Sequence, residues 1–287
     1  MRNDFAVFIL SHGRPNNVKT FKTLRDGGYT GKIYIIIDDE DSRADEYFRL
    51  YGNTIIQFSK AKEAEKTDAC DNFPKRNTVL FARNAAFKIA KDLGLQYFLE
   101  LDDDYGAIRY RYSKGNCLCS FRCFQFDRLF EAILEYLDET KAKTITFAQG
   151  GDFIGGTGST GWNKCLLRKA MNSFFIRTDN PFKFVGRMND DVNTYVTEGM
   201  RGELFLTVTD LAIEQMATQQ NEGGLTDMYL ELGTYVKSFY TVMQAPSCAK
   251  VAWMGTSHLR LHHHIAWNNA VPWIVPESYR KNKNTGN

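Results

Sequence analysis

QYFLELDDDY, residues 96–105, joins a short apolar run to three consecutive aspartates. An apolar run of this length, bounded by polar residues, is typical of a buried parallel strand. Two earlier runs, FAVFIL at residues 5–10 and IYIII at residues 33–37, also stop at polar clusters. Helix-compatible stretches separate the runs, so the sequence predicts an α/β protein with a mostly parallel central sheet flanked by helices.

Ligands of such sheets bind at the carboxyl ends of the strands. Three predicted strands end in polar clusters, at residues 11–14, 38–41 and 102–104. Aspartates at positions i and i+2 after a strand can divide the work, one reaching a divalent cation and the other a ribose or the cation's water. The alternative for Asp102–Asp104 is a solvated acidic loop.

The other strand-end and helix motifs each have a functional and a structural interpretation. Asp38 is suited to accept hydrogen bonds from a base or ribose, whereas Asp41 is better placed as a helix cap. Arg76 and Arg83 lie seven residues apart on a helix predicted over residues 76–93, so they share a face. An arginine there can fork onto a diphosphate. The alternative for both arginines is a surface ion pair.

Four further features lie in the second half of the chain. A carboxylate of the Asp190-Asp191 pair can take a proton from an acceptor hydroxyl, although capping of the following helix by Asn189 or Asp190 is an equal alternative. Arg109 and Arg111 alternate with tyrosines, as in nucleic-acid-binding segments and also in exposed strands. Trp162 is suited either to stack on a sugar or base or to pack in the core. The glycine-rich loop 150–161 is a candidate lid.

Composition sets the remaining limits. The chain has 287 residues, 43% hydrophobic and 24% charged, which are ordinary globular values. A net charge of +2 gives no global signal for or against nucleic acid. The six cysteines form no paired C-x-x-C set, so we expect no zinc site. No signal peptide and no membrane-spanning run is recognisable, so we expect a soluble, cytoplasmic protein without membrane contact and without an obligate protein partner.

These motifs, in this order, resemble the GT-A glycosyltransferase superfamily. The matching stretches are Ser11–Pro15, Asp38-Asp39, Ala82–Asn84, Asp102–Asp104, the pair Asp190-Asp191 and a C-terminal histidine of the run His262–His264. Within the superfamily, the ending over residues 260–281 resembles that of the TET-associated glycosyltransferases, which are encoded largely by bacteriophages. The resemblance covers most of the chain.

The resemblance implies a GT-A type, Rossmann-like single domain over residues 1–280. Its nucleotide-sugar-binding half would be residues 1–105 and its acceptor-binding half residues 106–280, followed by a loose tail, 281–287. It implies transfer of glucose or N-acetylglucosamine from a UDP-sugar to 5-hydroxymethylcytosine in DNA, with Mn²⁺ or Mg²⁺ as cofactor. If the gene belongs to a phage, the reaction takes place in the host cytoplasm.

The resemblance also implies roles for single residues. Asp104 would bind the metal, Asp102 the ribose or the metal, and Asp191, beside Asp190, would be the base. One histidine of the pair His262 and His263 would complete the metal shell; three consecutive histidines leave the ligand open. An Asp-Asp pair replaces the more usual Glu-Asp, which leaves the base open too. The other expected donor contacts are Ser11, Arg14, Asp38, Arg76, Arg83 and Asp103, and the expected acceptor contacts are Arg109, Arg111 and Trp162.

Two other functions share parts of this pattern. A GT-A enzyme acting on a glycan or protein would have the same donor-side motifs. A non-catalytic relative that binds a nucleotide or a nucleic acid would have the same fold.

Overall fold

The strands and helices alternate along the first half of the chain, as the sequence predicts.

The structure is a computed structural model that describes residues 1–149, 153, 155–159, 162, 169–215, 229, 233, 235–255, 259–275 and 277. The strands are β1 (Phe5–Leu10), β2 (Lys32–Asp38), β3 (Ile55–Phe58), β4 (Tyr97–Asp102), β5 (Tyr105–Lys114), β6 (Cys117–Arg122), β7 (Thr144–Gln149), β8 (Ser173–Arg177), β9 (Phe205–Gln215), β10 (Ala249–Met254) and β11 (Arg260–Ile265). The helices are α1 (Lys19–Asp26), α2 (Ala44–Tyr51), α3 (Lys60–Ala64), α4 (Leu80–Asp92), α5 (Phe126–Thr140), α7 (Asp190–Gly199), α9 (Val236–Gln244) and α10 (Trp267–Ala270), with short 3₁₀ helices at Pro15–Asn17, Gly52–Thr54 and Gly156–Gly158.

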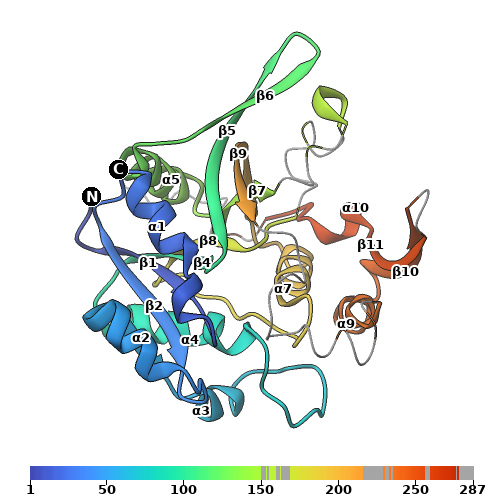
Figure 1. The fold of residues 1–287 in the computed structure, drawn as a ribbon. Coiled ribbons are helices and arrows are strands. Elements are labelled where there is room, and N and C mark those ends of the chain that lie inside the picture. The colour runs from blue at the N-terminus through green and yellow to red at the C-terminus, as the bar shows by residue number, and fades with distance from the viewer. Residues whose placement is uncertain are drawn as a thin grey trace, which may run out of the picture.

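One sheet runs through the molecule (Figure 1). It has nine strands in the order β3-β2-β1-β4-β8-β7-β9-β5-β6. β3, β2, β1 and β4 are mutually parallel. β8 is antiparallel to β4 and to β7, β9 is parallel to β7, and β5 is antiparallel to β9 and β6. The α/β class is therefore confirmed. The parallel arrangement holds for the first four strands, and the rest of the sheet is mixed.

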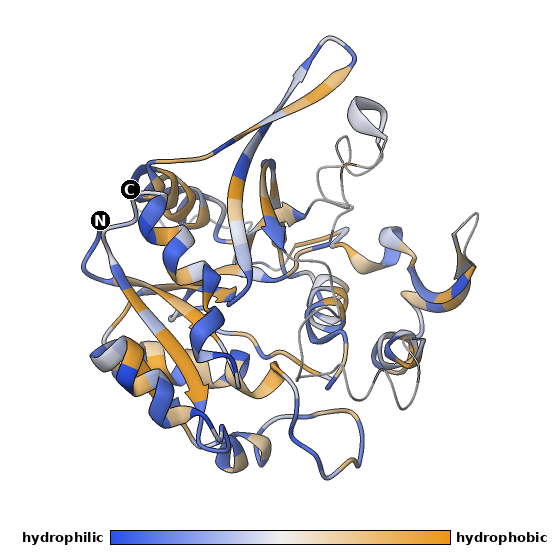
Figure 2. Ribbon diagram, in the orientation of Figure 1, coloured by the Kyte–Doolittle hydropathy of each residue, from blue (hydrophilic) through white to orange (hydrophobic). Residues whose placement is uncertain are grey.

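Alternate side chains of β1 pack into two different layers, because successive strand residues point to opposite faces. Phe5, Val7 and Ile9 join one core cluster with α1 and α5. Ala6, Phe8 and Leu10 join the other with α4. All six are buried, which explains why this strand is a continuous apolar run rather than an alternating one. Figure 2 shows apolar colour along much of β1 and β2 and mixed colours on the helices beside them.

The second half adds a smaller core of its own. α7, α10 and the β10–β11 hairpin pack through a third cluster that includes Val192, Tyr195 and Ile265. The β5–β6 hairpin extends outward from the end of the large sheet (Figure 1). None of the helices in the described part of the chain combines the length and apolar character needed to cross a bilayer.

Candidate active site

The carboxyl ends of β1, β2 and β4 meet at one edge of the sheet. In register, Leu10 lies beside Ile36 of β2 and beside Asp102 of β4. The polar clusters that follow these strands are therefore brought together, as expected for parallel neighbours. The structure joins residues 11–14, 38–41 and 102–104 through direct side-chain contacts.

Asp103 lies beneath this edge and contacts the loop after β1. Its Oδ2 accepts a hydrogen bond of 2.5 Å from Ser11, and its Oδ1 lies 3.0 Å from Arg14. Tyr47 of α2 bonds Ser11 as well, at 2.6 Å. Burial raises the pKa of Asp103 to about 6, although Arg14 and Ser11 act in the opposite direction. Three predicted donor contacts, Ser11, Arg14 and Asp103, thus form one hydrogen-bonded unit.

Asp38 lies in a basic environment that the sequence did not indicate. His12 Nδ1 is 2.7 Å and Lys60 Nζ is 3.2 Å from its Oδ2. Burial acts to raise the pKa of Asp38, but the contacts with His12 and Lys60 outweigh it and the pKa is lowered. Asp38 is therefore ionised and oriented. Lys60 is buried and belongs to no recognisable motif, so only the fold brings it to Asp38.

Asp41 does not cap α2, contrary to the expectation. Helix α2 begins at Ala44 and Arg43 is its N-cap residue, without a side-chain cap. Instead, Asp41 accepts hydrogen bonds from the amide nitrogens of Gly13, at 2.7 Å, and of Arg43, at 2.9 Å. It therefore fixes the loop after β1 against the loop after β2.

Asp102 and Asp104 have surroundings different from those of Asp103. The side chain of Asp102 is 24% exposed, 3.4 Å from Arg83, and accepts a hydrogen bond from the Tyr105 hydroxyl. Oδ1 of Asp104 is buried and has no hydrogen-bond partner in the described part of the chain. Burial, then the charges of Asp102 and Asp103, raise the pKa of Asp104 to about 6. A buried carboxylate oxygen without a donor is suited to a cation.

Arg83 connects the aspartate strand to the acidic helix start. Its Nε lies 2.9 Å from Oδ2 of Asp190, an ion pair without hydrogen-bond geometry, and its Nη2 lies 3.4 Å from Oδ1 of Asp102. The guanidinium lies against the rings of Phe174 and Phe184, and the side chain is 3% exposed. Arg83 therefore faces carboxylates on both sides of the site.

Asp190 and Asp191 open α7 and are both buried. Oδ1 of Asp191 accepts a hydrogen bond of 2.7 Å from the amide of Val192. Burial raises the pKa of both carboxyls, more strongly than Arg83 lowers it. A carboxylate whose pKa is raised takes up a proton more readily at neutral pH. The N-cap position is occupied by Asn189, in a left-handed conformation and without a side-chain cap.

Glu100 adds a fourth carboxyl to this group. It lies on β4, two residues before Asp102, and is 1% exposed. Neither of its carboxyl oxygens has a hydrogen-bond partner among the residues that the structure describes. Burial raises the pKa of Glu100 well above its ordinary value, against the charge of Arg83. Glu100 carries no signal in the sequence beyond a charged residue inside an apolar strand.

The histidines lie on β11 and contact the acidic helix through Asn189. Nδ2 of Asn189 donates to the carbonyl of Lys237 at 2.9 Å and lies 3.1 Å from Nδ1 of His263, which accordingly accepts. Nδ1 of His262 donates to the carbonyl of His263 at 2.9 Å, which leaves Nε2 of His262 unprotonated. Burial lowers the pKa of both rings, that of His263 to about 3, so both are neutral. The described residues contain no group of three or more His, Cys, Asp or Glu side chains placed to hold a metal ion.

Arg76 lies before α4 rather than on it, because the helix begins at Leu80. It therefore shares no helix face with Arg83. Its guanidinium pairs with Glu40 in the loop after β2 and is 39% exposed. The surface ion pair is thus formed, at the rim of the same edge of the sheet.

The predicted acceptor contacts form a separate group on β5 and beside β7. Arg109 pairs with Glu214 of β9 at 3.3 Å, and Arg111 lies over the ring of Phe153 at 4.0 Å. Trp162 also contacts Phe153, with ring centroids 6.0 Å apart, at the margin of a small buried cluster. Trp162 is thus partly buried. Half of loop 150–161, the candidate lid, lies outside the described residues, and so does the whole of the predicted tail, 281–287.

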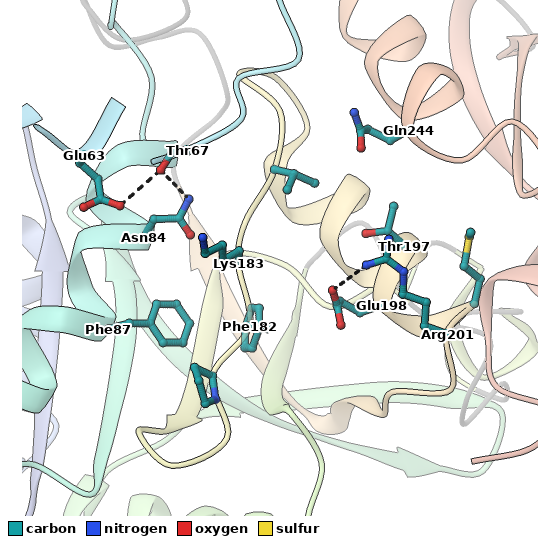
Figure 3. Close-up of a pocket in the computed structure, with 13 residues that line it drawn as sticks. Glu63, Thr67, Asn84, Phe87, Phe182, Lys183, Thr197, Glu198, Arg201 and Gln244 are labelled. Carbon is teal, nitrogen blue, oxygen red and sulfur yellow. Dashed lines mark hydrogen bonds and ion pairs between the residues drawn. The ribbon is translucent and has the colours of Figure 1, made fainter. Parts of the chain in front are cut away.

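A cavity of about 590 Å³ lies elsewhere, between α4, the segment 181–185 and the C-terminal end of α7 (Figure 3). Its lining includes Phe87, Phe182, Lys183, Glu198 and Arg201. Asn84, the last residue of the Ala82–Asn84 stretch, is among the described lining residues, whereas the residues predicted to contact donor, metal or acceptor are not. Asp190 and Asp191 begin α7, whereas the cavity adjoins its other end.

The described structure is an α/β protein with acidic side chains gathered at the carboxyl ends of its parallel strands. Residues 5–224 match the family model of the TET-associated glycosyltransferases. The match spans well over half of the chain, so the chain belongs to this family and is a glycosyltransferase.

Solved structures similar to this chain include glucosyl-3-phosphoglycerate synthase from Mycobacterium tuberculosis in complex with Mg²⁺ and UDP, at 9% identity and a TM-score of 0.49, covering 96% of this chain and 88% of that one. The same enzyme with Mn²⁺, UDP and glucosyl-3-phosphoglycerate gives 9% identity and a TM-score of 0.48, covering 97% and 92%. These TM-scores are below 0.5, so the likeness defines neither the donor nor the acceptor of this chain. No curated protein matches the sequence.

Proposed function

We propose that this glycosyltransferase moves glucose or N-acetylglucosamine from a UDP-sugar to the hydroxyl of 5-hydroxymethylcytosine in DNA. One observation carries the proposal: Arg83 joins Asp102, at the end of β4, to Asp190, at the start of α7. Arg83 thus pairs with a carboxylate that we assign to the donor side and with one that we assign to the acceptor side. Residues 1–105 are the nucleotide-sugar-binding half and residues 106–280 the acceptor-binding half of the domain.

The proposed donor contacts fall into two groups. The first is a bonded unit in which Asp103 contacts both Ser11 and Arg14. In the second, Asp38, which contacts His12 and Lys60, would accept hydrogen bonds from the base or the ribose. Arg76, which is partly exposed, would contact the diphosphate. Arg83 serves the donor indirectly by fixing Asp102.

A divalent cation, Mn²⁺ or Mg²⁺, fits the carboxylates of Asp104 and Asp102. Oδ1 of Asp104, which is buried and has no hydrogen-bond partner among the described residues, supports this assignment. Such ions are commonly held by one or two carboxylates together with substrate phosphates and water, so three protein ligands are not required. Of the two histidines, His262 is the better nitrogen ligand because its Nε2 is unprotonated. The bound cation would neutralise the charge of the departing diphosphate.

Asp191 is the base, and Asp190 holds Arg83. The acceptor hydroxyl gives its proton to the Asp191 carboxylate while its oxygen bonds to the anomeric carbon of the sugar. The bond from that carbon to the diphosphate oxygen breaks, and UDP leaves with the electron pair. Asp191 suits the role because no ion pair to it is recorded in the described part of the chain, whereas Asp190 faces Arg83 at 2.9 Å.

The DNA acceptor is supported by the family and by the basic, aromatic strand β5 with Arg109, Arg111 and the nearby Trp162. The hydroxyl of 5-hydroxymethylcytosine is a primary alcohol that projects into the major groove of a duplex. We place the reaction in the cytoplasm, the host's if the gene is a phage's, where UDP-sugars and DNA meet.

The test is mass spectrometry of nucleosides after incubating hydroxymethylcytosine DNA with Mn²⁺ and a panel of UDP-sugars. We expect a mass increase of one hexose or one N-acetylhexosamine on hydroxymethylcytidine, and none with unmodified cytosine DNA. An Asp191→Asn variant should lose the transfer. If the enzyme transferred sugar to a glycan or a protein but not to DNA, the proposed DNA acceptor would be wrong. If it consumed none of the UDP-sugars, the proposed glycosyltransferase reaction would be contradicted.

A further inference from the structure

The β5–β6 hairpin has a charge pattern that differs from that of the whole chain. Residues 105–126 contain Arg109, Arg111, Lys114 and Arg122 and no aspartate or glutamate. The whole chain is nearly balanced, with 36 basic and 34 acidic residues. A projecting hairpin with basic residues alone attracts a polyanion.

The same hairpin bears a cluster of exposed aromatic rings on one face. Tyr110 is paired with Phe121 and Tyr112 with Cys119, and residues directly opposite each other share a face. The ring centroids of Tyr110 and Phe121 are 5.2 Å apart, and those of Tyr112 and Phe121 are 6.0 Å apart. Tyr110 and Tyr112 are each 38% exposed and Phe121 is 54% exposed. By the two-residue period of the strand, Lys114 is on this face too.

The opposite face holds the arginines, and it is turned toward the protein. Arg109 pairs with Glu214 of the neighbouring strand, and Arg111 covers Phe153. Both side chains are partly buried, whereas the rings on the other face are exposed. The open surface of the hairpin is therefore the aromatic one, with Lys114 near its tip.

We propose that the β5–β6 hairpin is a docking arm for single-stranded DNA, in which Tyr110, Tyr112 and Phe121 stack on unpaired bases. The arm rests on the proposed function, since the DNA it binds is the acceptor strand. Aromatic side chains stack on the π faces of bases, and those faces are accessible only when a base is unpaired or has left the helix. Lys114, which is exposed on the same face near the tip, supplies attraction to the phosphates of the strand.

The experiment measures binding of an unmodified, fluorescein-labelled oligothymidylate and of a blunt duplex by fluorescence anisotropy. The variant Tyr110→Leu/Tyr112→Leu/Phe121→Leu keeps apolar side chains and every charge but removes the rings. We expect wild type to prefer the single strand and the triple variant to lose single-strand affinity by about tenfold or more, since each stacked base contributes appreciably. The salt dependence should be unchanged, because no charge is altered.

Two controls isolate the arm. Tyr136→Leu removes a ring that is 46% exposed on α5, and it should bind the oligonucleotide as wild type does. Thermal unfolding of each variant shows whether it is folded. If the triple variant is unstable, the single variant Phe121→Leu replaces it, with a smaller expected loss of single-strand affinity.

The outcomes separate the arm from the reaction. If wild type binds the single strand and the correctly folded triple variant binds it equally well, the arm is overturned while the DNA acceptor stands. If wild type binds neither DNA at low salt, the proposed DNA acceptor fails. If the triple variant loses self-association and keeps its DNA affinity, the face belongs to a second copy of the chain and the arm is overturned.

Discussion

Arg83 carries more of the site's organisation than any other single residue. It is buried, it faces Asp102 and Asp190, and Glu100 and Asp191 also contribute to its electrostatic environment. Its pKa is raised, because the attraction of these carboxyls outweighs the burial that acts to lower it. Removing one partner of a buried ion pair leaves the other charges uncompensated, which costs more than the pair gains.

Arg83→Met is therefore expected to lower the free energy of unfolding by about 3–5 kcal/mol, as for other broken buried pairs. Urea unfolding at pH 7 measures it. Arg76→Met is the matched control, because that arginine pairs with Glu40 at the surface, where ion pairs contribute little. Equal stability of the two variants would show that Arg83 does not hold the acidic group together.

Sequence reasoning located the acidic residues but not their partners. Strand ends predicted that Ser11, Asp38 and Asp103 gather at one edge, and the contacts among the loops bear out that gathering. The bond between Ser11 and Asp103 joins residues 92 positions apart. Burial and partners of this kind depend on the packed fold, so neither Lys60 beside Asp38 nor the buried Glu100 was predictable from local pattern.

At the scale of elements, the segment between α3 and α4 is fastened by Asp71. Oδ2 of Asp71 lies 2.7 Å from Nε of Arg187, its Oδ1 2.8 Å from Nη2, and the hydroxyl of Tyr240 in α9 donates to Oδ2 at 2.6 Å. Arg187 is almost fully buried. Burial acts to raise the pKa of Asp71, but Arg187 and Tyr240 outweigh it and lower the pKa.

Asp71→Asn should lower the free energy of unfolding by about 3 kcal/mol at pH 7. A lowered folded-state pKa contributes stability above the ordinary value of 3.8, and this stability is lost as the pH falls below it. The difference between wild type and Asp71→Asn in urea unfolding should therefore shrink between pH 5 and pH 3. Asp179→Asn, which breaks an exposed pair with Arg177, should change little at either pH. A difference that persists undiminished at low pH would refute the role of this charge.

The elements themselves were predicted unevenly. Continuous apolar runs located β1, β2 and β4, and the apolar stripe located α5. Helix α4 begins at Leu80, later than predicted. Before it, the hydroxyl of Thr78 donates a hydrogen bond to the carbonyl of Arg187 and accepts one from the amide of Leu80. The direction of β8 and the pairing of β5 with β9 depend on strands far apart in sequence, which periodicity does not encode.

At the scale of the whole molecule, the net charge of +2 conceals a separation of charge. Carboxylates gather where β1, β2 and β4 end, whereas the β5–β6 hairpin carries basic residues alone. Composition could not reveal this, because a sum over the chain does not record position. A cation at the strand ends and a polyanion on the hairpin are the ligands that this distribution favours.

The cation has a test that does not depend on activity. Because a ligand that binds the folded state stabilises it, MnCl₂ with UDP should raise the unfolding temperature of wild type, by an amount equivalent to about 2.7 kcal/mol at a hundredfold excess over the dissociation constant. Asp104→Asn should abolish most of that increase, because it replaces the carboxylate whose oxygen lacks a partner.

Without metal, Asp104→Asn should not lower the stability of the protein. Asp104 is crowded by Asp102 and Asp103, and its pKa is raised by burial and by their charges, so a neutral amide relieves repulsion and should leave the metal-free protein equally or more stable. Asp92→Asn, which alters an exposed carboxylate on α4, should reproduce the wild-type shift with Mn²⁺. An Asp104→Asn variant that is stabilised by Mn²⁺ and UDP as much as wild type would remove the cation from this edge of the sheet.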